Sequence, residues 1–131
     1  MNYIKKLRKV KPLVHNITNY VTVNDVANAI LAIGGSPIMS DEITEVAQMT
    51  SISNALNINI GTLNQVKIAS MFEAGKASNA CQHITVLDPV GAGATDLRTN
   101  TCKDLLAQIH FDAIKGNISE IKTLMAGSGH T

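Results

Sequence analysis

Hydrophobic and polar residues alternate with two different periods along the chain. Apolar-rich runs of four to six residues predict strands at 36–39, 55–60, 83–88 and 112–115. Apolar residues that recur every three or four positions predict helices over about 3–10, 19–33, 42–53, 62–79, 96–110 and from 117 onward. Because strands and helices alternate four times, we expect an α/β fold with a mostly parallel sheet and helical crossovers.

Small, polar and charged residues follow each predicted strand. Ligands of an open parallel sheet bind beyond the carboxyl ends of its strands, so these residues are candidates for a site. Loops of any α/β protein are also polar, and the convergence alone leaves a site and plain connecting loops equally open. The segments concerned are 39–41, 61–62, 88–95 and 115–117.

The composition is that of a globular protein. The 131 residues fit one domain, with 45% hydrophobic residues, 16% charged residues and a net charge of +1. Aromatic residues make up 3% and Trp is absent, so the stacking platform of a single-stranded nucleic-acid binder is not expected. No apolar run resembles a signal peptide or reaches the roughly 18 residues of a membrane span. We therefore expect a cytoplasmic protein with neither a nucleic-acid nor a membrane partner.

The spacing of cysteines and histidines predicts no metal site. Cys81 and Cys102 form no C-x-x-C motif, and we interpret both as reduced thiols. The four histidines lack the spacing of zinc ligands. Only His15 lies within a polar cluster, and it is the one histidine that we keep as a functional candidate.

The stretch "VLDPVGAGAT", residues 86–95, is a candidate ligand loop. It lacks the Gly-Lys pair of a P-loop, and Asp96 stands where a dinucleotide fingerprint needs a third Gly or Ala. Pro89 biases Asp88 to an extended conformation at the strand end, which suits a carboxylate ligand of a hard cation. We expect Gly91 and Gly93 to bring backbone amides close to an anion such as a polyphosphate. A plain strand-to-helix turn explains the stretch equally well.

The stretch "KGNISEI", residues 115–121, adds a cation and a second acid. Asn117 and Glu120 have the spacing of a capping box, which by itself explains both. Lys115, however, ends the preceding predicted strand. Phosphoryl transfer needs positive charge to offset the phosphates and acids to hold Mg²⁺ or its waters, and these residues together with Asp88 supply both.

Four stretches together resemble the hydroxyethylthiazole kinase family. They are "PLVHNITNYVTVNDVANAILAIGGSPIMSDE", "LNINIGTL", "VLDPVGAGAT" and "KGNISEI". In this order and spacing they are highly specific, and the resemblance runs from about Pro12 to about Ile121. It implies a ribokinase-like fold, of which this chain has only the N-terminal part. It also implies phosphorylation of the alcohol of 4-methyl-5-(2-hydroxyethyl)thiazole by ATP, with Mg²⁺, in thiamine biosynthesis and salvage.

The resemblance also implies roles for seven residues and a homotrimer with active sites at the subunit boundaries. Lys115 replaces the arginine that the family usually has against ATP, which keeps the charge but loses a bidentate fork. The implied substrate residues are Asn19, Met39 and Gly61, those for ATP are Lys115 and Asn117, and those for Mg²⁺ are Asp88 and Glu120.

Family members continue for about as long again beyond Thr131. We therefore expect residues 1–131 to form a single incomplete ribokinase-like domain whose C-terminal half is absent from this chain. The catalytic residue and the anion hole are expected in that half, so no catalytic residue is named and the chain alone is expected to be inactive. Two alternatives stay open, namely a non-catalytic fragment or binding module, and a ribokinase-like kinase of hydroxymethylpyrimidine or pyridoxal.

Overall fold

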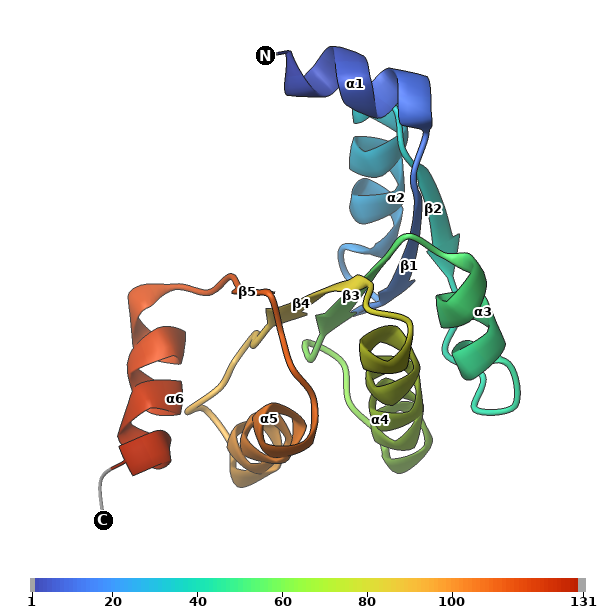
Figure 1. Cartoon of the computed structure of the whole chain (residues 1–131). Coiled ribbons are helices and arrows are strands. Elements are labelled where there is room, and N and C mark those ends of the chain that lie inside the picture. Colours follow the sequence, from blue (N-terminus) through green and yellow to red (C-terminus); the bar gives the residue numbers. More distant parts are fainter. Residues whose placement is uncertain (1, 130–131) are drawn as a thin grey trace.

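The structure, a computed structural model that describes residues 2–129, is built on a five-stranded parallel sheet (Figure 1). The order of the strands across the sheet is β2-β1-β3-β4-β5, and every neighbouring pair is parallel. This arrangement confirms the predicted α/β class. The strands are β1 (Leu13–Ile17), β2 (Ser36–Met39), β3 (Ala55–Asn59), β4 (Ile84–Asp88) and β5 (Ala113–Ile114).

Helices cover both faces of the sheet (Figure 1). Helix α2 lies on one face with α1 against it, whereas α3, α4 and α5 form a layer on the other face and α6 follows beside α5. Within the described residues, no helix combines the length and apolar character that crossing a membrane requires. The helices are α1 (Tyr3–Val10), α2 (Val23–Ile33), α3 (Val46–Ile52), α4 (Gln65–Ala80), α5 (Asp96–Gln108) and α6 (Ile118–Gly129).

The chain changes direction across the sheet at β1. Strand β2 pairs with one side of β1, and β3 pairs with the other. The loops after β1 and β3 therefore leave toward opposite faces, because their helices α2 and α4 cover opposite faces. Such a switch point opens a crevice at the carboxyl ends of the strands, where ligands of open α/β sheets bind.

Strand β1 is absent from the pattern-based prediction, which placed only four strands. Its sequence, LVHNI, interrupts an apolar run with His15 and Asn16. Both polar residues are buried, at 0% and 1% exposure, and both hydrogen-bond within the protein. A central strand with buried polar side chains carries no apolar signature, so the prediction of four strands was wrong.

Three predicted helices begin later in the structure than their periodicity indicated. Helix α2 starts at Val23 rather than near 19, because Asn19 Oδ1 accepts hydrogen bonds from the backbone and hydroxyl of Thr22 and holds a loop there. Helix α3 starts at Val46 rather than near 42. Helix α4 is capped by Asn64, whose side chain accepts from the Lys67 amide at 2.8 Å, and not by Thr62 as predicted.

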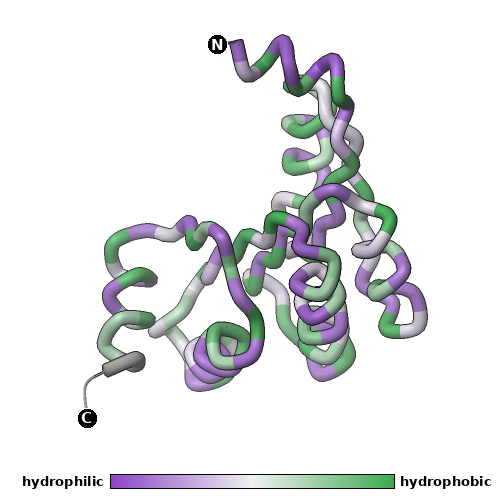
Figure 2. Tube along the Cα trace, in the orientation of Figure 1, coloured by the Kyte–Doolittle hydropathy of each residue, from purple (hydrophilic) through white to green (hydrophobic). Residues whose placement is uncertain are grey.

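The hydrophobic core lies between the sheet and the layer of α3, α4 and α5. Full burial of one large apolar side chain stabilises the folded state by about 1.5–3 kcal/mol. In contrast, none of the eleven described residues of α2 is buried, although its sequence is mainly hydrophobic (Figure 2). The largest apolar core residues, all exposed by less than 2%, are Ile17, Leu56, Ile58, Ile60, Met71, Leu87 and Leu105.

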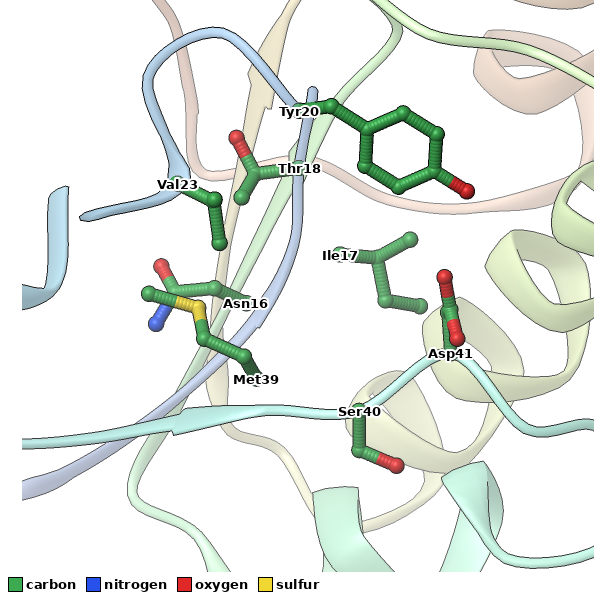
Figure 3. Close-up of a pocket in the computed structure, with 8 residues that line it drawn as sticks. All are labelled: Asn16, Ile17, Thr18, Tyr20, Val23, Met39, Ser40 and Asp41. Carbon is green, nitrogen blue, oxygen red and sulfur yellow. The ribbon is translucent and has the colours of Figure 1, made fainter.

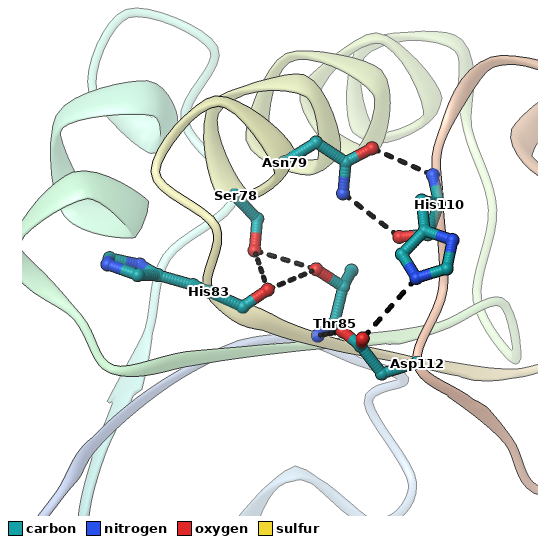
Figure 4. Close-up of polar contacts among 6 residues, drawn as sticks. All are labelled: Ser78, Asn79, His83, Thr85, His110 and Asp112. Atoms are coloured by element: carbon teal, nitrogen blue, oxygen red, sulfur yellow. Dashed lines mark hydrogen bonds and ion pairs between the residues drawn. The ribbon is translucent and has the colours of Figure 1, made fainter.

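A group of polar contacts links neighbouring elements at the amino end of β4 (Figure 4). The Asn79 side chain donates to the His110 carbonyl at 2.9 Å and accepts from its amide at 2.7 Å. Asp112 accepts from the Thr85 amide at 2.8 Å and pairs with the His110 ring at 3.4 Å. These contacts join α4 to the connection between α5 and β5, at the end of the sheet opposite to the predicted site.

Candidate functional site

A pocket of about 190 Å³ opens at the carboxyl ends of β1 and β2 (Figure 3). Met39 lies beside Asn16 and Val23, and Tyr20 and Asp41 lie on the opposite side. The lining combines apolar groups with a few polar ones, as small-molecule pockets do. The lining residues are Asn16, Ile17, Thr18, Tyr20, Val23, Met39, Ser40 and Asp41.

Asn19 and Gly61, two of the predicted substrate residues, meet beside this pocket but do not line it. The Asn19 side chain donates to Asn59 Oδ1 at 3.0 Å, and the same oxygen accepts from the Gly61 amide at 2.8 Å. A Cβ atom on Gly61 would lie 2.8 Å from the Asn19 Cβ. The close approach of these two loops therefore requires glycine at position 61, and it joins the end of β1 to the end of β3.

Residues 39–41 form one wall of the pocket, and hydrogen bonds to three side chains hold this wall in place. His15 bonds the Ser40 carbonyl through Nε2 at 2.8 Å, and the Ser70 hydroxyl donates to the Asp41 carbonyl at 2.7 Å. The Ser40 hydroxyl in turn donates to Glu45. The conformation of this wall thus depends on β1, on α4 and on the residue that precedes α3.

His15 has one tautomer in this arrangement. A carbonyl oxygen can only accept, so Nε2 carries the proton and donates to Ser40. Nδ1 is then an acceptor, and the Thr50 hydroxyl donates to it at 2.8 Å. Burial lowers the pKa of His15 below its ordinary value of 6.5, and the Ser40 carbonyl and the Glu45 charge oppose this shift more weakly.

Lys67 places a buried ammonium group behind the pocket, at 3% exposure. The ammonium donates to the Thr18 carbonyl and lies 4.6 Å from the centroid of the Tyr20 ring. Burial lowers the pKa of Lys67, and the charge of Asp41 partly opposes that shift. Pattern analysis missed this residue, although a signal existed, because a cation in the first turn of a helix opposes the helix dipole.

A second group of predicted residues meets at the ends of β4 and β5. Lys115 Nζ lies 3.6 Å from Asp88 Oδ2, with the lysine side chain largely exposed and the aspartate mostly buried. The Lys115 amide donates to the Leu87 carbonyl at 2.9 Å, which fixes the two strand ends side by side. The structure thus brings a predicted Mg²⁺ residue next to a predicted ATP residue.

Glu120 joins the start of α6 to the glycine turn after β4. One carboxylate oxygen accepts from the Gly91 amide at 2.9 Å, and the other accepts from the Asn117 amide at 3.0 Å. Asn117 completes the predicted capping box by accepting from the Glu120 amide at 2.8 Å. Glu120 and Asn117 lie with residues 91–94 around a pocket of about 310 Å³.

The amides of the glycine turn do not point to a free anion site. Gly91 and Gly93 adopt positive φ angles of 78° and 95°, as the turn requires. The Gly91 amide is taken by Glu120, and the Gly93 amide donates to Thr99 Oγ1 at 2.9 Å. The fold therefore uses both glycine donors internally, and the approach of backbone amides of this turn to a polyphosphate stays a prediction.

Arg98 is a further residue that pattern analysis missed. Its guanidinium donates to the Val90 carbonyl and to the Gly61 carbonyl, each at 2.9 Å. It therefore ties the loop after β3 to the loop after β4. Like Lys67, Arg98 lies in the first turn of a helix, where a positive charge opposes the helix dipole. Its bonds to two loop carbonyls offset that cost.

The oxygen donors at the carboxyl edge suit Mg²⁺ only in part. Mg²⁺ is held in kinases by one or two carboxylates, with phosphates and waters completing its shell. The Asp88 carboxylate fits this pattern, whereas both Glu120 oxygens already bind backbone amides. Among residues 2–129, no three His, Cys, Asp or Glu side chains are grouped so that they could hold a metal ion.

Both cysteines are free thiols, as predicted. Cys102 is fully buried under the sheet, and burial together with the charge of Glu120 raises its pKa to about 12. A thiol with such a pKa is not ionised near neutral pH and is a poor nucleophile or base.

Known sequences place the chain in a family. A family model described as the hydroxyethylthiazole kinase family matches residues 4–131. The chain is 56% identical over 128 residues to hydroxyethylthiazole kinase of Clostridium acetobutylicum, and 53% identical over 130 residues to that of Clostridium tetani. The matches cover 98% and 99% of this chain but 47% of each relative. The chain spans about half the length of the curated relatives it matches.

The fold gives the same result. The solved structure of hydroxyethylthiazole kinase from Pyrococcus horikoshii OT3 matches with a TM-score of 0.91 and 44% sequence identity. That match covers 95% of this chain and 48% of the other. From the sequence and the fold together, the chain belongs to the hydroxyethylthiazole kinase family.

Proposed function

We propose that the chain forms the alcohol pocket and part of the nucleotide site of a kinase. The proposed substrate is 4-methyl-5-(2-hydroxyethyl)thiazole, whose hydroxyl receives the γ-phosphoryl group of ATP. The observation that carries the proposal is the shared edge of the sheet. The chain belongs to this family, and two groups of residues lie at the carboxyl ends of its parallel strands. One is the pocket of about 190 Å³ lined by Met39, called the Met39 pocket below, and the other is the group of Asp88, Lys115 and Glu120.

Each part of the edge has a proposed task. The Met39 pocket binds the thiazole ring, and Asn19 and Gly61 fix the neighbouring loops. Lys115 offsets phosphate charge, with Asn117 at the same turn, and Asp88 would hold Mg²⁺. Glu120 keeps the glycine turn in place beside that acid. When bound, Mg²⁺ supplies positive charge that stabilises the transferring phosphoryl group.

The reaction itself is an in-line displacement. The alcohol oxygen forms a bond to the γ-phosphorus of ATP, the bond to the ADP oxygen breaks, and the hydroxyl proton leaves to a base. Cys102 is excluded as that base by burial, and His15 by its two hydrogen bonds. We expect the base in the part of the relatives that this chain does not match.

Replacing Asp88 by Asn tests the proposal in the protein as its gene encodes it. ADP release that depends on the thiazole alcohol should occur in the parent protein. The variant should lower turnover far more than it weakens alcohol binding, because the lost charge acts on the phosphates. Asp104→Asn, an exposed position on α5, is the matched control. A parent protein that binds the alcohol without releasing ADP would instead be a binding module.

We also propose that the protein assembles as a homotrimer. The supporting feature is α2, a mainly hydrophobic helix whose residues Leu31 and Ile33 are 56% and 45% exposed. Exposed apolar surface of this kind is typical of an interface. Sedimentation equilibrium at micromolar concentration should give three times the protomer mass, and a stable monomer would contradict the proposal.

A further inference from the structure

We infer that His15 is a positioning residue for the alcohol pocket. Its imidazole, held in orientation by Thr50, donates to the Ser40 carbonyl and so fixes the wall of residues 39–41. The assignment of the pocket to an alcohol rests on the function proposed above. The anchoring of the wall by His15 rests on the contacts alone.

The wall needs an anchor because of its place in the sheet. It begins at Met39, the last residue of β2, a strand of four residues that stands at one edge of the sheet and pairs only with β1 among the described strands. Short edge segments open at low free energy unless side chains hold them. Met39 is itself 36% exposed, so packing alone holds it weakly.

His15 reaches the wall from a strand that is paired on both sides. It lies on β1, which pairs with β2 through Ile38 and with β3 through Leu56. The ring is 0% exposed, and its partner Thr50 on α3 is 1% exposed. The bond to Thr50 is therefore shielded from water, and the bond to Ser40 is partly shielded, so water competes poorly for the His15 ring.

The Ser40 carbonyl decides which ring nitrogen carries the proton. Because that carbonyl can only accept, the proton of the neutral ring lies on Nε2, and the Thr50 hydroxyl then donates to Nδ1 and fixes the orientation of the ring. The other tautomer would place a lone pair against that carbonyl and release the wall. Glu45, which binds the Ser40 hydroxyl, is the charged group that faces this contact.

Four variants test the inference. His15→Gln places an amide donor near the position of Nε2, whereas His15→Asn places an amide near Nδ1 and falls short of Ser40. Thr50→Val removes the donor to Nδ1. Thr85→Val is the matched control, because Thr85 is equally buried and shares a 2.7 Å hydrogen bond with Ser78 at the opposite end of the sheet (Figure 4).

Kinetics should separate positioning from general destabilisation. We expect His15→Asn and Thr50→Val to raise KM for the alcohol about tenfold with little change in kcat or in KM for ATP. His15→Gln should recover most of that loss. Thr85→Val should lower the melting temperature like Thr50→Val but leave KM unchanged. Equal KM values for the two threonine variants, or no recovery by glutamine, would overturn the inference.

A spectroscopic readout is independent of the proposed reaction. The ¹⁵N signals of the His15 ring should show a protonated Nε2 and an unprotonated Nδ1 in the parent protein. In Thr50→Val, Nδ1 loses its hydrogen-bond donor, so its ¹⁵N signal should move toward that of a free imine nitrogen while Nε2 stays protonated, and the backbone amide signals of residues 39–41 should shift or broaden. Unchanged signals in that variant would refute the anchor even if no phosphorylation is observed, whereas an inactive protein with the expected signals would refute only the proposed function.

Discussion

The Lys67 ammonium lies 4.6 Å from the centroid of the Tyr20 ring, directly behind the proposed alcohol pocket. It is buried at 3% exposure, and it donates a hydrogen bond to the Thr18 carbonyl rather than to a carboxylate. Burying a cation without a close acid costs stability. Lys67 therefore contributes more to the shape of the pocket than to the stability of the fold, because Thr18 and Tyr20 both line the pocket.

Replacing Lys67 by Met should separate these two effects. We expect KM for the alcohol to rise about three- to tenfold, as the loss of a desolvated cation–π contact predicts. The free energy of unfolding should stay equal or increase, because an apolar side chain of similar length replaces a buried charge. Lys76→Met, which removes an exposed lysine from the same helix, is the control. A large loss of stability with an unchanged KM would show that Lys67 serves only the fold.

The stability of the protein should depend on the protonation of His15. Its pKa in the folded state lies below 6.5, so the unfolded chain binds a proton more readily. This contribution to stability is complete above pH 6.5 and is lost as the pH falls toward the lowered folded value. The slope should approach at most about 1.4 kcal/mol per pH unit. Urea unfolding of the parent protein and of His15→Gln at several pH values should give curves that converge at low pH, and parallel curves would contradict the assignment.

Lys115 offers a test of the nucleotide side of the site. Its side chain is 80% exposed, so its ion pair with Asp88 contributes little to stability. Lys115→Met should therefore raise KM for ATP without lowering the melting temperature. Lys115→Arg should keep or improve ATP binding, because a guanidinium adds a bidentate contact to phosphate. Lys103→Met, at an exposed position on α5, should leave both quantities unchanged.

The contacts at the amino end of the sheet should affect stability alone. Asn79→Ala removes two hydrogen bonds to the His110 backbone and should lower the free energy of unfolding by about 1–2 kcal/mol. Asn100→Ala, at an exposed position on α5, should cost less than about 0.5 kcal/mol. Because Asn79 lies at the opposite end of β4 from Asp88, KM for the alcohol should not change. A rise in that KM would show that the two ends are coupled.

Pattern analysis succeeded where the signal is local. The strand predicted at 83–88 and the helix predicted at 96–110 follow from hydrophobic periodicity, and the structure has them at 84–88 and 96–108. The reciprocal bonds of Asn117 and Glu120 follow from their spacing, because a capping box forms within one turn of helix. The meeting of the candidate residues at one edge followed from topology, since parallel strands end at the same edge of the sheet.

Pattern analysis failed where a residue acts across the fold. Arg98 and Lys67 bind carbonyls 37 and 49 positions away along the chain, and no local spacing encodes such partners. The amides of Gly91 and Gly93 are occupied by side chains of Glu120 and Thr99. Whether an amide faces a ligand or a side chain depends on which helix packs beside the turn.

The sequence by itself determined the α/β class, the resemblance to a kinase family and the edge of the sheet where the candidate residues lie, because periodicity, capping and motif spacing are properties of neighbouring residues. Only the tertiary structure revealed β1. Its buried residues His15 and Asn16 are polar, so the strand has no apolar pattern, and they are accommodated by hydrogen bonds inside the protein. The tertiary structure also decided that the pocket wall is held by His15 and Thr50, residues 35 positions apart. A buried hydrogen bond has value only where both partners are removed from water together, and that condition is set by packing.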